Sequence, residues 1–390
     1  MRIAYDHQIF SLQKTGGIAR YFCRLAEQLN AVGQDAGVKE RVEVGVFAPF
    51  YRNQYLSQLP SKVVHGTQVK DYLPKTAGLM VGVNGLIGRH KLRQWHPDLV
   101  HETYFSKTRS APQKTPVVLT VFDMIGELGG GIDGQSLSNQ ALASMRQSDK
   151  YAAVARADHV ICISEHTRKD LITLFDTPEN KVSVAYLGCD GLPPGQISEV
   201  ELLTEVEPLK EQRPFLLYVG LRGGYKNFTA FLQAIALSAK LKNSFDLIAF
   251  GGGTLTMMEQ EQIKALGFKP NQIKQFGGDD HALATLYQKA SALVYPSTYE
   301  GFGLPPIEAM SQKCPVVCSH TSSIPEVVGE AGEYFDPRQP ESMALAIENV
   351  VFSRERTEAL IKKGLERAKY FTWDRCAEKH LSVYHSLIRT

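Results

Sequence analysis

A chain of 390 residues, at roughly 150 residues per domain, has room for two or three domains, and two is the simpler expectation. Hydrophobic residues make up 43% and charged residues 22% of the chain, a composition that excludes disordered, collagen-like and coiled-coil proteins. The 43 basic and 41 acidic side chains leave a net charge of +2, so nothing in the charge points to nucleic acid as a partner.

The sequence shows neither a membrane-spanning segment nor a secretory signal. No uninterrupted apolar run reaches the ~18–20 residues that cross a bilayer, and the first residues lack the charged and then apolar pattern of a signal peptide. The six cysteines include no Cys-x-x-Cys pair of the kind that binds a metal ion. We therefore expect a cytoplasmic protein whose thiols are reduced and buried.

Short apolar runs typical of strands recur along the chain, and segments with helical periodicity separate them. In the first half the expected strands are residues 42–47, 99–101, 117–122, 159–164 and 182–186. In the second half they are residues 215–219, 247–250, 273–276, 293–295, 316–318 and 333–335, with helices such as 227–241 and 259–266 between them. This alternation predicts an α/β fold with two doubly wound, Rossmann-like domains, each built on a parallel sheet, facing across a cleft.

A change of composition marks the boundary between the two halves. Residues 191–195 read GLPPG, and a weakly patterned acidic stretch follows before the next strand begins. We expect a first domain over residues 1–192, a linker over 193–213 and a second domain over 214–373. The last helix, about 374–390, is expected to pack back on the first domain.

In open parallel sheets the chemistry gathers in the loops after strands, and the first such loop is 14–20, KTGGIAR. Gly16 and Gly17 precede a helix through residues 21–29, where backbone N–H groups and the helix dipole can meet an anion. Glycine pairs at such turns also serve backbone geometry alone, and the sequence leaves both roles open. No dinucleotide fingerprint, Gly-x-Gly-x-x-Gly with an acidic partner, is present, which disfavours a dehydrogenase.

The second loop, 220–227, follows the expected strand 215–219 and reads GLRGGYKN. Arg222 and Lys226 are two cations on a glycine-rich turn that opens a helix, an arrangement suited to a diphosphate. A solvated basic loop is the alternative. Because both cations follow the end of a strand, we favour a binding role.

Residues 295–310, YPSTYEGFGLPPIEAM, are the most informative segment. Glu300 precedes the glycines, and two prolines predict a helix that carries Glu308 in its first turn. The two carboxylates can accept hydrogen bonds from the hydroxyls of a sugar and a ribose, while free N–H groups of the backbone between them face phosphate. Glu308 taken alone is better explained as a residue that stabilises the helix dipole.

With Glu300 and Glu308 separated by seven residues, this segment resembles the signature of the family-four retaining glycosyltransferases of the GT-B fold. Shorter segments resemble the family in the same order along the chain, and they cover nearly all of it. They are 15–21 TGGIARY, 161–167 ICISEHT, 218–220 YVG with 225–228 YKNF, 250–253 FGGG, 286–290 LYQKA and 323–327 SIPEV.

The resemblance implies a site for a nucleotide sugar. It assigns the diphosphate to Arg222 and Lys226 and the ribose to Glu308. It assigns the transferred sugar to Glu300 and to the backbone of Gly303 and Leu304.

In the first half of the chain, the resemblance assigns the phosphate side of the cleft to Gly16 and Gly17. One departure lies in 120–124, TVFDM, because many members of the family have histidine where this chain has Phe122. The role of that histidine falls to Asp123, to His101 after a strand, or to no residue. His101 is equally well explained as a hydrogen-bonded polar residue at a strand end.

The resemblance implies an enzyme that moves a sugar from a nucleotide sugar to a saccharide or lipid-linked hydroxyl acceptor, with retention at the anomeric carbon. Two cations are at hand and no Asp-x-Asp pair is present, so we expect neither a metal ion nor another cofactor. Similarity to bacterial polysaccharide mannosyltransferases makes GDP-mannose the first candidate donor. A GT-B epimerase or phosphorylase, or a non-catalytic carbohydrate-binding protein, is the alternative.

The apolar residues 79–88, LMVGVNGLIG, are followed by the basic segment 89–95, RHKLRQW. They lie in the half of the chain up to residue 190, whose 22 basic and 18 acidic residues leave a net charge of +4. This pattern is typical of a helix on an anionic membrane, which would place the protein on the inner face of the membrane and make the acceptor lipid-linked. The alternative, which we slightly favour, is a helix packed on its own sheet with solvated charges outside.

Overall fold

The computed structural model describes the chain except for residues 34–40, 74, 129–143, 190, 192–212 and 389–390. It divides into two compact units, and each is described by itself. The first unit holds Met1–Met124, Ser136–Gly188 and Trp373–Thr390, and the second holds Ile125–Gln135 and Cys189–Thr372. Nearly all of the linker expected over 193–213 lies outside the described residues.

A six-stranded parallel sheet forms the centre of the first unit, in the order β2-β1-β5-β6-β7-β8. The strands are β1 (Arg2–Tyr5), β2 (Glu43–Val46), β5 (Leu99–Glu102), β6 (Val117–Val121), β7 (His159–Cys162) and β8 (Val182–Val184). A small pair is formed by β3 (Phe50–Tyr51) and β4 (Thr67–Gln68). The helices are α1 (Gln8–Leu12), α2 (Gly17–Val32), α3 (Ala77–Trp95), α5 (Asp149–Arg156), α6 (Glu165–Phe175) and α16 (Trp373–Ile388).

The second unit repeats this plan with a six-stranded parallel sheet in the order β11-β10-β9-β12-β13-β14. The strands are β9 (Phe215–Val219), β10 (Asp246–Phe250), β11 (Ile273–Phe276), β12 (Ala292–Tyr295), β13 (Val316–Ser319) and β14 (Gly332–Phe335). The helices are α8 (Phe228–Leu237), α9 (Ala239–Ser244), α10 (Met257–Ala265), α11 (Asp280–Lys289), α12 (Leu304–Ser311), α13 (Ile324–Val328), α14 (Pro340–Val351) and α15 (Arg354–Ala368).

The expected α/β class with two Rossmann-like sheets is confirmed, and the strand sequences explain it. Every residue of the central strands β6, VVLTV, and β9, FLLYV, is buried, as in a parallel sheet covered on both faces. In each sheet the strand order reverses once, between β1 and β5 and between β9 and β12. Ligands of doubly wound sheets bind beyond the carboxyl ends of the strands at such a reversal.

The helices of the structure differ from the expectation in two places. The helix expected over 227–241 is broken at Ser238, whose extended backbone ends α8 and whose Oγ accepts a hydrogen bond from the N–H of Leu241 at 3.0 Å, which caps α9. A short helix, α1, lies between the first strand and the Gly16–Gly17 loop, and its five residues are too few to show a helical period.

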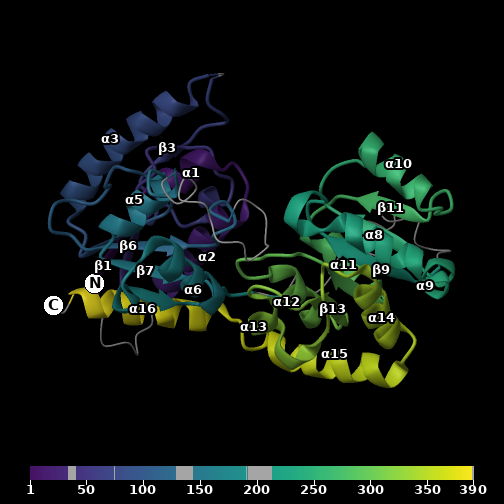
Figure 1. Ribbon diagram of the computed structural model, residues 1–390. Coiled ribbons are helices and arrows are strands. Elements are labelled where there is room, and N and C mark those ends of the chain that lie inside the picture. The colour runs from purple at the N-terminus through teal and green to yellow at the C-terminus, as the bar shows by residue number, and fades with distance from the viewer. Residues whose placement is uncertain (34–40, 74, 129–143, 190, 192–212, 389–390) are drawn as a thin grey trace. The chain divides into compact units, whose positions relative to one another are not determined.

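The last helix of the chain, α16, belongs to the first unit, where it packs against α2 (Figure 1). Its buried side chains include Cys376, His380 and Tyr384. The rings of Tyr5 and Tyr21 lie against this helix, and the Tyr21 hydroxyl is 2.7 Å from Nε2 of His380. Residues from the two ends of the chain therefore share one buried layer.

Candidate functional site

The reversal point of the second sheet brings together two residues that the sequence singled out. Lys226 lies in the loop after β9 and Glu300 in the loop after β12, and these two strands are neighbours. Lys226 Nζ is 2.6 Å from Glu300 Oε1. The side chains are only 16% and 9% exposed, so the ion pair is largely shielded from water and holds both groups in one geometry.

The loop that carries Lys226 is fastened by the residue that follows it. Lys226 ends a single 3₁₀ turn, Gly224–Lys226, and Asn227 adopts the left-handed conformation with φ 59°. The Asn227 amide donates to the carbonyls of Pro296 and Pro337 at 3.1 and 2.9 Å. Asparagine tolerates this backbone conformation better than most residues, so its side chain can tie the β9 loop to the β12 loop.

Serines from the loop after β13 fasten the segment around Glu300. The N–H of Glu300 donates to Ser322 Oγ at 2.8 Å. Ser323 Oγ donates to the carbonyls of Glu300 and Phe302, each at 2.9 Å. Three consecutive strand ends of the sheet thus fix the position of one carboxylate.

The ring of the buried Tyr295 lies close to both Lys226 and the start of α12. Lys226 Nζ lies 5.6 Å from the ring centroid, and a Cβ placed on Gly303 would be 3.8 Å from the same ring. Burial, and then the charge of Glu300, raises the pKa of Tyr295 well above its usual value, so the phenol stays neutral. Lys226, Glu300 and the start of α12 therefore gather around one aromatic side chain.

Helix α12 begins directly after Gly303, whose φ of 109° suits glycine and strains any other residue. Pro305 and Pro306 lie in its first turn and lack N–H groups, which leaves the N–H of Leu304 among the free donors at this helix start. Glu308 is the fifth residue of the helix, so it lies at the start of the second turn and not in the first turn as expected. The hydroxyl of the buried Tyr287 donates to Glu308 Oε2 at 3.2 Å.

Arg222 does not lie with Lys226 and Glu300. Its guanidinium pairs with Glu259 at 2.7 Å and donates to the carbonyls of Gly251 and Thr254, each at 2.9 Å, and its side chain is 3% exposed. Burial alone would raise the pKa of Glu259, but the hydrogen bonds from Arg222 and Thr256 outweigh it and hold the pKa below its usual value. In this conformation Arg222 positions the glycine loop after β10 and offers little to a diphosphate.

Gly16 and Gly17 lie at the amino end of α2 in the first unit. Gln13 Oε1 accepts a hydrogen bond from the N–H of Ala19 at 3.2 Å and would be 2.4 Å from a Cβ on Gly16. Glycine is thus needed at position 16 for the Gln13 side chain to approach. No described residue lies within 4 Å of a Cβ on Gly17, which leaves space for a ligand beside that backbone in the part of the chain that the structure describes.

His101 is completely buried, and both of its ring nitrogens have partners. Nδ1 lies 2.7 Å from the Tyr384 hydroxyl, and Nε2 lies 2.8 Å from Thr120 Oγ1. Burial, with the nearby His380, lowers the pKa of His101 well below its usual value. This environment is that of a satisfied structural histidine, the alternative that the sequence left open, and it has no exposed edge for an acceptor.

His380 predicts a loss of stability in acid. Burial lowers the pKa of His380 to about 4, below the value of 6.5 in the unfolded chain. Between these two values only the unfolded chain binds the proton, so the folded state becomes less stable as the pH is lowered. We expect the free energy of unfolding of the first unit to fall by about 3 kcal/mol between about pH 7 and pH 4, and urea unfolding at each pH measures it. The His380→Gln variant should show a correspondingly weaker pH dependence, and an unchanged dependence would contradict this account.

Phe122, in the place where histidine was expected, packs edge-to-face on Tyr21 with ring centroids 5.1 Å apart. It therefore completes an apolar layer against α2. Asp123 follows it and is half-buried, and its main-chain carbonyl accepts a hydrogen bond from Lys150 Nζ at 3.0 Å. Of the two acceptor-side candidates, only Asp123 keeps a partly exposed side chain.

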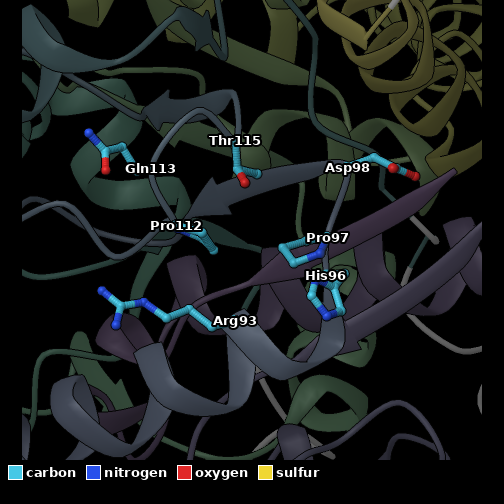
Figure 2. A pocket seen from close by; sticks show the side chains of 7 residues that line it. All are labelled: Arg93, His96, Pro97, Asp98, Pro112, Gln113 and Thr115. Carbon is cyan, nitrogen blue, oxygen red and sulfur yellow. The ribbon is translucent and has the colours of Figure 1, made fainter.

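A pocket of about 620 Å³ lies at the other end of the first sheet (Figure 2). Its lining residues precede β5 and β6 and are Arg93, His96, Pro97, Asp98, Pro112, Gln113 and Thr115. Asp98 Oδ2 accepts a hydrogen bond from the N–H of Arg2 at 2.7 Å. This pocket lies at the amino ends of the strands, away from the edge where doubly wound sheets bind their ligands.

Sequence reasoning missed Asn227, Ser322 and Ser323, which hold the site without being expected to touch a ligand. Asn227 directly follows Lys226 at a helix start, where asparagine is common at turns, so a signal was present. Ser323 opens the family-like segment SIPEV, but neither serine shows a local signal for its contact, because their partners lie more than twenty residues earlier in the chain.

Comparisons with known proteins agree with this fold. The family described as Glycosyl transferases group 1 matches residues 200–367, and Glycosyltransferase Family 4 matches residues 15–190. The O-antigen chain mannosyltransferase B of Escherichia coli is 30% identical over 234 residues, which make up 58% of this chain and 60% of that protein. The O-antigen chain mannosyltransferase RfbU of Salmonella typhimurium is 29% identical over 51% of this chain and 52% of its own length.

This chain therefore aligns with 60% or less of the length of these two relatives. Among solved structures, Anabaena Alr3699/HepE in complex with UDP and glucose superposes with a TM-score of 0.68 and 18% identity, over 99% of this chain and 100% of that one. Identity this low shows a shared fold. Because two successive family matches extend from residue 15 to 190 and from 200 to 367 on this fold, the chain belongs to the family-four glycosyltransferases of the GT-B fold.

Proposed function

We propose that this glycosyltransferase moves mannose from GDP-mannose to a hydroxyl group of a saccharide, with retention at the anomeric carbon. The observation that carries the proposal is the shielded Lys226–Glu300 pair at the reversal point of the second sheet, beside the start of α12. Two relatives are named O-antigen chain mannosyltransferases, which supports mannose and the synthesis of a cell-surface polysaccharide. Because the similar HepE structure contains UDP, uridine nucleotide sugars are the first donors to compare with GDP-mannose.

In the proposed reaction, the bond from the anomeric carbon to the diphosphate oxygen breaks as the acceptor oxygen bonds to the same face of the sugar. The acceptor proton passes to the departing phosphate oxygen, so no protein nucleophile is required. Negative charge grows on the diphosphate, where Lys226 and the N–H of Leu304 at the start of α12 would stabilise it. One such preorganised donor contributes about 3–4 kcal/mol to the transition state.

Glu300 has two roles in this proposal. Its carboxylate holds Lys226 in place before the donor arrives, and its second oxygen can accept a hydrogen bond from a sugar hydroxyl. With a cation and a helix start provided by the protein, we propose that the reaction needs no metal ion, and we expect transfer to continue in EDTA. Gly17 remains a proposed contact of the donor phosphate, and Asp123 remains the proposed contact on the acceptor side.

The test incubates the protein with GDP-mannose or UDP-glucose, with and without a fluorescently labelled mannoside. We expect nucleotide release and a new α-glycoside that depend on the acceptor, identified by the C1–H1 coupling in NMR spectra. An epimerase would change the nucleotide sugar without any acceptor. A phosphorylase would need inorganic phosphate, a binding protein would release no nucleotide, and a β-linked product would contradict retention.

Glu308 is proposed to bind the ribose of the donor. Because a ribose contact exists in the ground state as well as the transition state, we expect Glu308→Ala to raise KM for the donor by roughly tenfold with little change in kcat. Initial rates over a range of donor concentrations measure both constants. Tyr287→Phe removes only the hydrogen bond to Glu308 and serves as the milder control. A fall in kcat alone would contradict the ribose assignment.

We propose that the acceptor is carried on a lipid at the cytoplasmic face of a membrane. Among the helices of the described residues, none is long and apolar enough to cross a bilayer. The relatives' role in O-antigen chains supports a saccharide that is built on a carrier. Transfer to an extracted lipid-linked saccharide that exceeds transfer to the free mannoside would support this choice.

A further inference from the structure

Helix α3 is attached to the first unit by a polar side chain and glycines. Only Asn84, Gly88 and Leu92 of its residues are buried. Asn84 Oδ1 accepts a hydrogen bond from the N–H of Phe50 at 2.7 Å, and its Nδ2 donates to the Phe50 carbonyl at 2.8 Å and to Ser11 Oγ at 3.0 Å. Paired hydrogen bonds of this kind fix the helix without burying much apolar surface.

The glycines on the same side let neighbouring groups approach the helix closely. A Cβ on Gly85 would lie 3.5 Å from the His7 ring, and one on Gly88 would lie 3.5 Å from the carbonyl of Phe47. Larger side chains here would push the helix outward. The inner face of α3 is therefore made of an amide and two glycines, with Leu92 as its one large buried residue.

Part of the apolar surface of α3 lies on its outer face. Leu79 and Leu86 are 68% and 72% exposed, and Gly82, His90 and Arg93 are also exposed. The spacing of these residues, at 79, 82, 86, 90 and 93, is that of one helix face. Leu92 packs against Ala4 and Val100 of the sheet, so this end of α3 has the packing that was preferred. Leu79 and Leu86 instead face outward, the reverse of the usual arrangement of a surface helix.

The charged side chains of α3 are all basic. Residues 72–97 contain Lys75, Arg89, Lys91 and Arg93 and no Asp or Glu. Arg93 follows Leu86 by seven residues and is exposed, so it extends the same face, and the half-buried Arg89 lies at the edge of that face. In Figure 1, α3 runs along the rim of the first unit. An outward apolar stripe continued by cations complements a surface that is apolar inside and negatively charged at its boundary.

We propose that the outer face of α3 docks the first unit on a bilayer that contains anionic lipids. Leu79 and Leu86 lie at the boundary between headgroups and acyl chains, and Arg89 and Arg93 lie against the headgroups. The proposal deepens the proposed function by naming the surface that brings the enzyme to a lipid-linked acceptor. It depends on that function only for the acceptor, because the binding itself involves no sugar.

Co-sedimentation of the full chain with lipid vesicles tests the docking surface. We expect binding to vesicles of equal parts phosphatidylglycerol and phosphatidylcholine at low salt, weaker binding at high salt, and no binding to phosphatidylcholine alone. Leu79→Ser with Leu86→Ser should weaken binding by roughly tenfold, because both side chains lose their apolar surface. Arg89→Glu with Arg93→Glu should weaken it by at least roughly tenfold.

Matched variants on the second unit separate the surface from general effects. Met257→Ser with Met258→Ser removes two side chains that are each 80% exposed, and Lys264→Glu with Lys269→Glu changes the net charge as the arginine pair does. Both pairs should bind vesicles like the unchanged protein. The changed side chains are exposed except that of Arg89, which is half-buried, and thermal unfolding verifies each fold.

Absence of binding to the anionic vesicles at low salt would overturn the proposal, as would an equal loss of binding in the matched variants. Neither result would contradict the proposed transfer reaction, because that reaction is measured with a soluble mannoside and no lipid. Conversely, vesicle binding without any sugar transfer would retain the docking surface and reject the proposed function.

Discussion

Replacing Lys226 by alanine is expected to lower kcat/KM for sugar transfer by at least ~100-fold, because one cation facing the developing diphosphate charge is lost. Initial rates with GDP-mannose and a labelled acceptor measure the effect. The control is Lys289→Ala, which removes an exposed lysine of the same unit. Transfer at the rate of the unchanged protein would remove Lys226 from the reaction.

The shielded pair requires one more variant, because Lys226→Ala also leaves Glu300 without its partner. An uncompensated buried charge lowers stability, and that alone can reduce activity. Lys226→Met combined with Glu300→Gln removes both charges and keeps both volumes. We expect this double variant to unfold near the temperature of the unchanged protein and still transfer sugar at least ~100-fold more slowly. Restored activity would assign the pair a purely structural role.

Replacing Arg222 by alanine is expected to lower the free energy of unfolding by about 3 kcal/mol, since it breaks a largely buried ion pair and its hydrogen bonds to loop carbonyls. This loss lies at the lower end of the range for buried ion pairs, because the Glu259 side chain is 18% exposed. Arg222→Lys should recover little, because a lysine cannot match the geometry of the guanidinium. Urea unfolding measures both variants.

This expectation differs from the diphosphate contact that the sequence suggested for Arg222. If Arg222→Ala keeps the stability of the unchanged protein and loses transfer, the sequence-based assignment is right, and the side chain must leave Glu259 when the donor binds. A loss of stability that accounts for the loss of activity supports the positioning role.

Much of the fold follows from local sequence, because buried parallel strands are short apolar runs and their ends carry the functional loops. The residue pattern of the loop after β9 and of the segment after β12 sufficed to select Lys226 and Glu300. Their meeting at 2.6 Å follows from strand order, which places β9 beside β12. Parallel sheets bring such loops together even when 74 residues separate them.

The contacts that the sequence left open share a physical cause, because each concerns a side chain whose partners are distant in sequence. Arg222 turns inward because carbonyls of the β10 loop and Glu259 satisfy its donors, and no local pattern shows this. His101 is buried by Tyr384, which lies 283 residues further along the chain. The sequence offered both orientations of the α3 leucines and could not choose between them, because their orientation depends on the hydrogen bonds of Asn84 to Phe50.

The measurement that tests the central claim most directly is the thermal unfolding of the protein and of Lys226→Ala with GDP, UDP and other nucleoside diphosphates. A ligand present at about 100 times its Kd stabilises the folded state by about 2.7 kcal/mol. We predict that at least one nucleotide, first of all GDP, raises the unfolding temperature of the unchanged protein and has a much smaller effect on Lys226→Ala. A panel in which no nucleotide raises it, or one in which Lys226→Ala responds as strongly, would contradict a donor site at the Lys226–Glu300 pair.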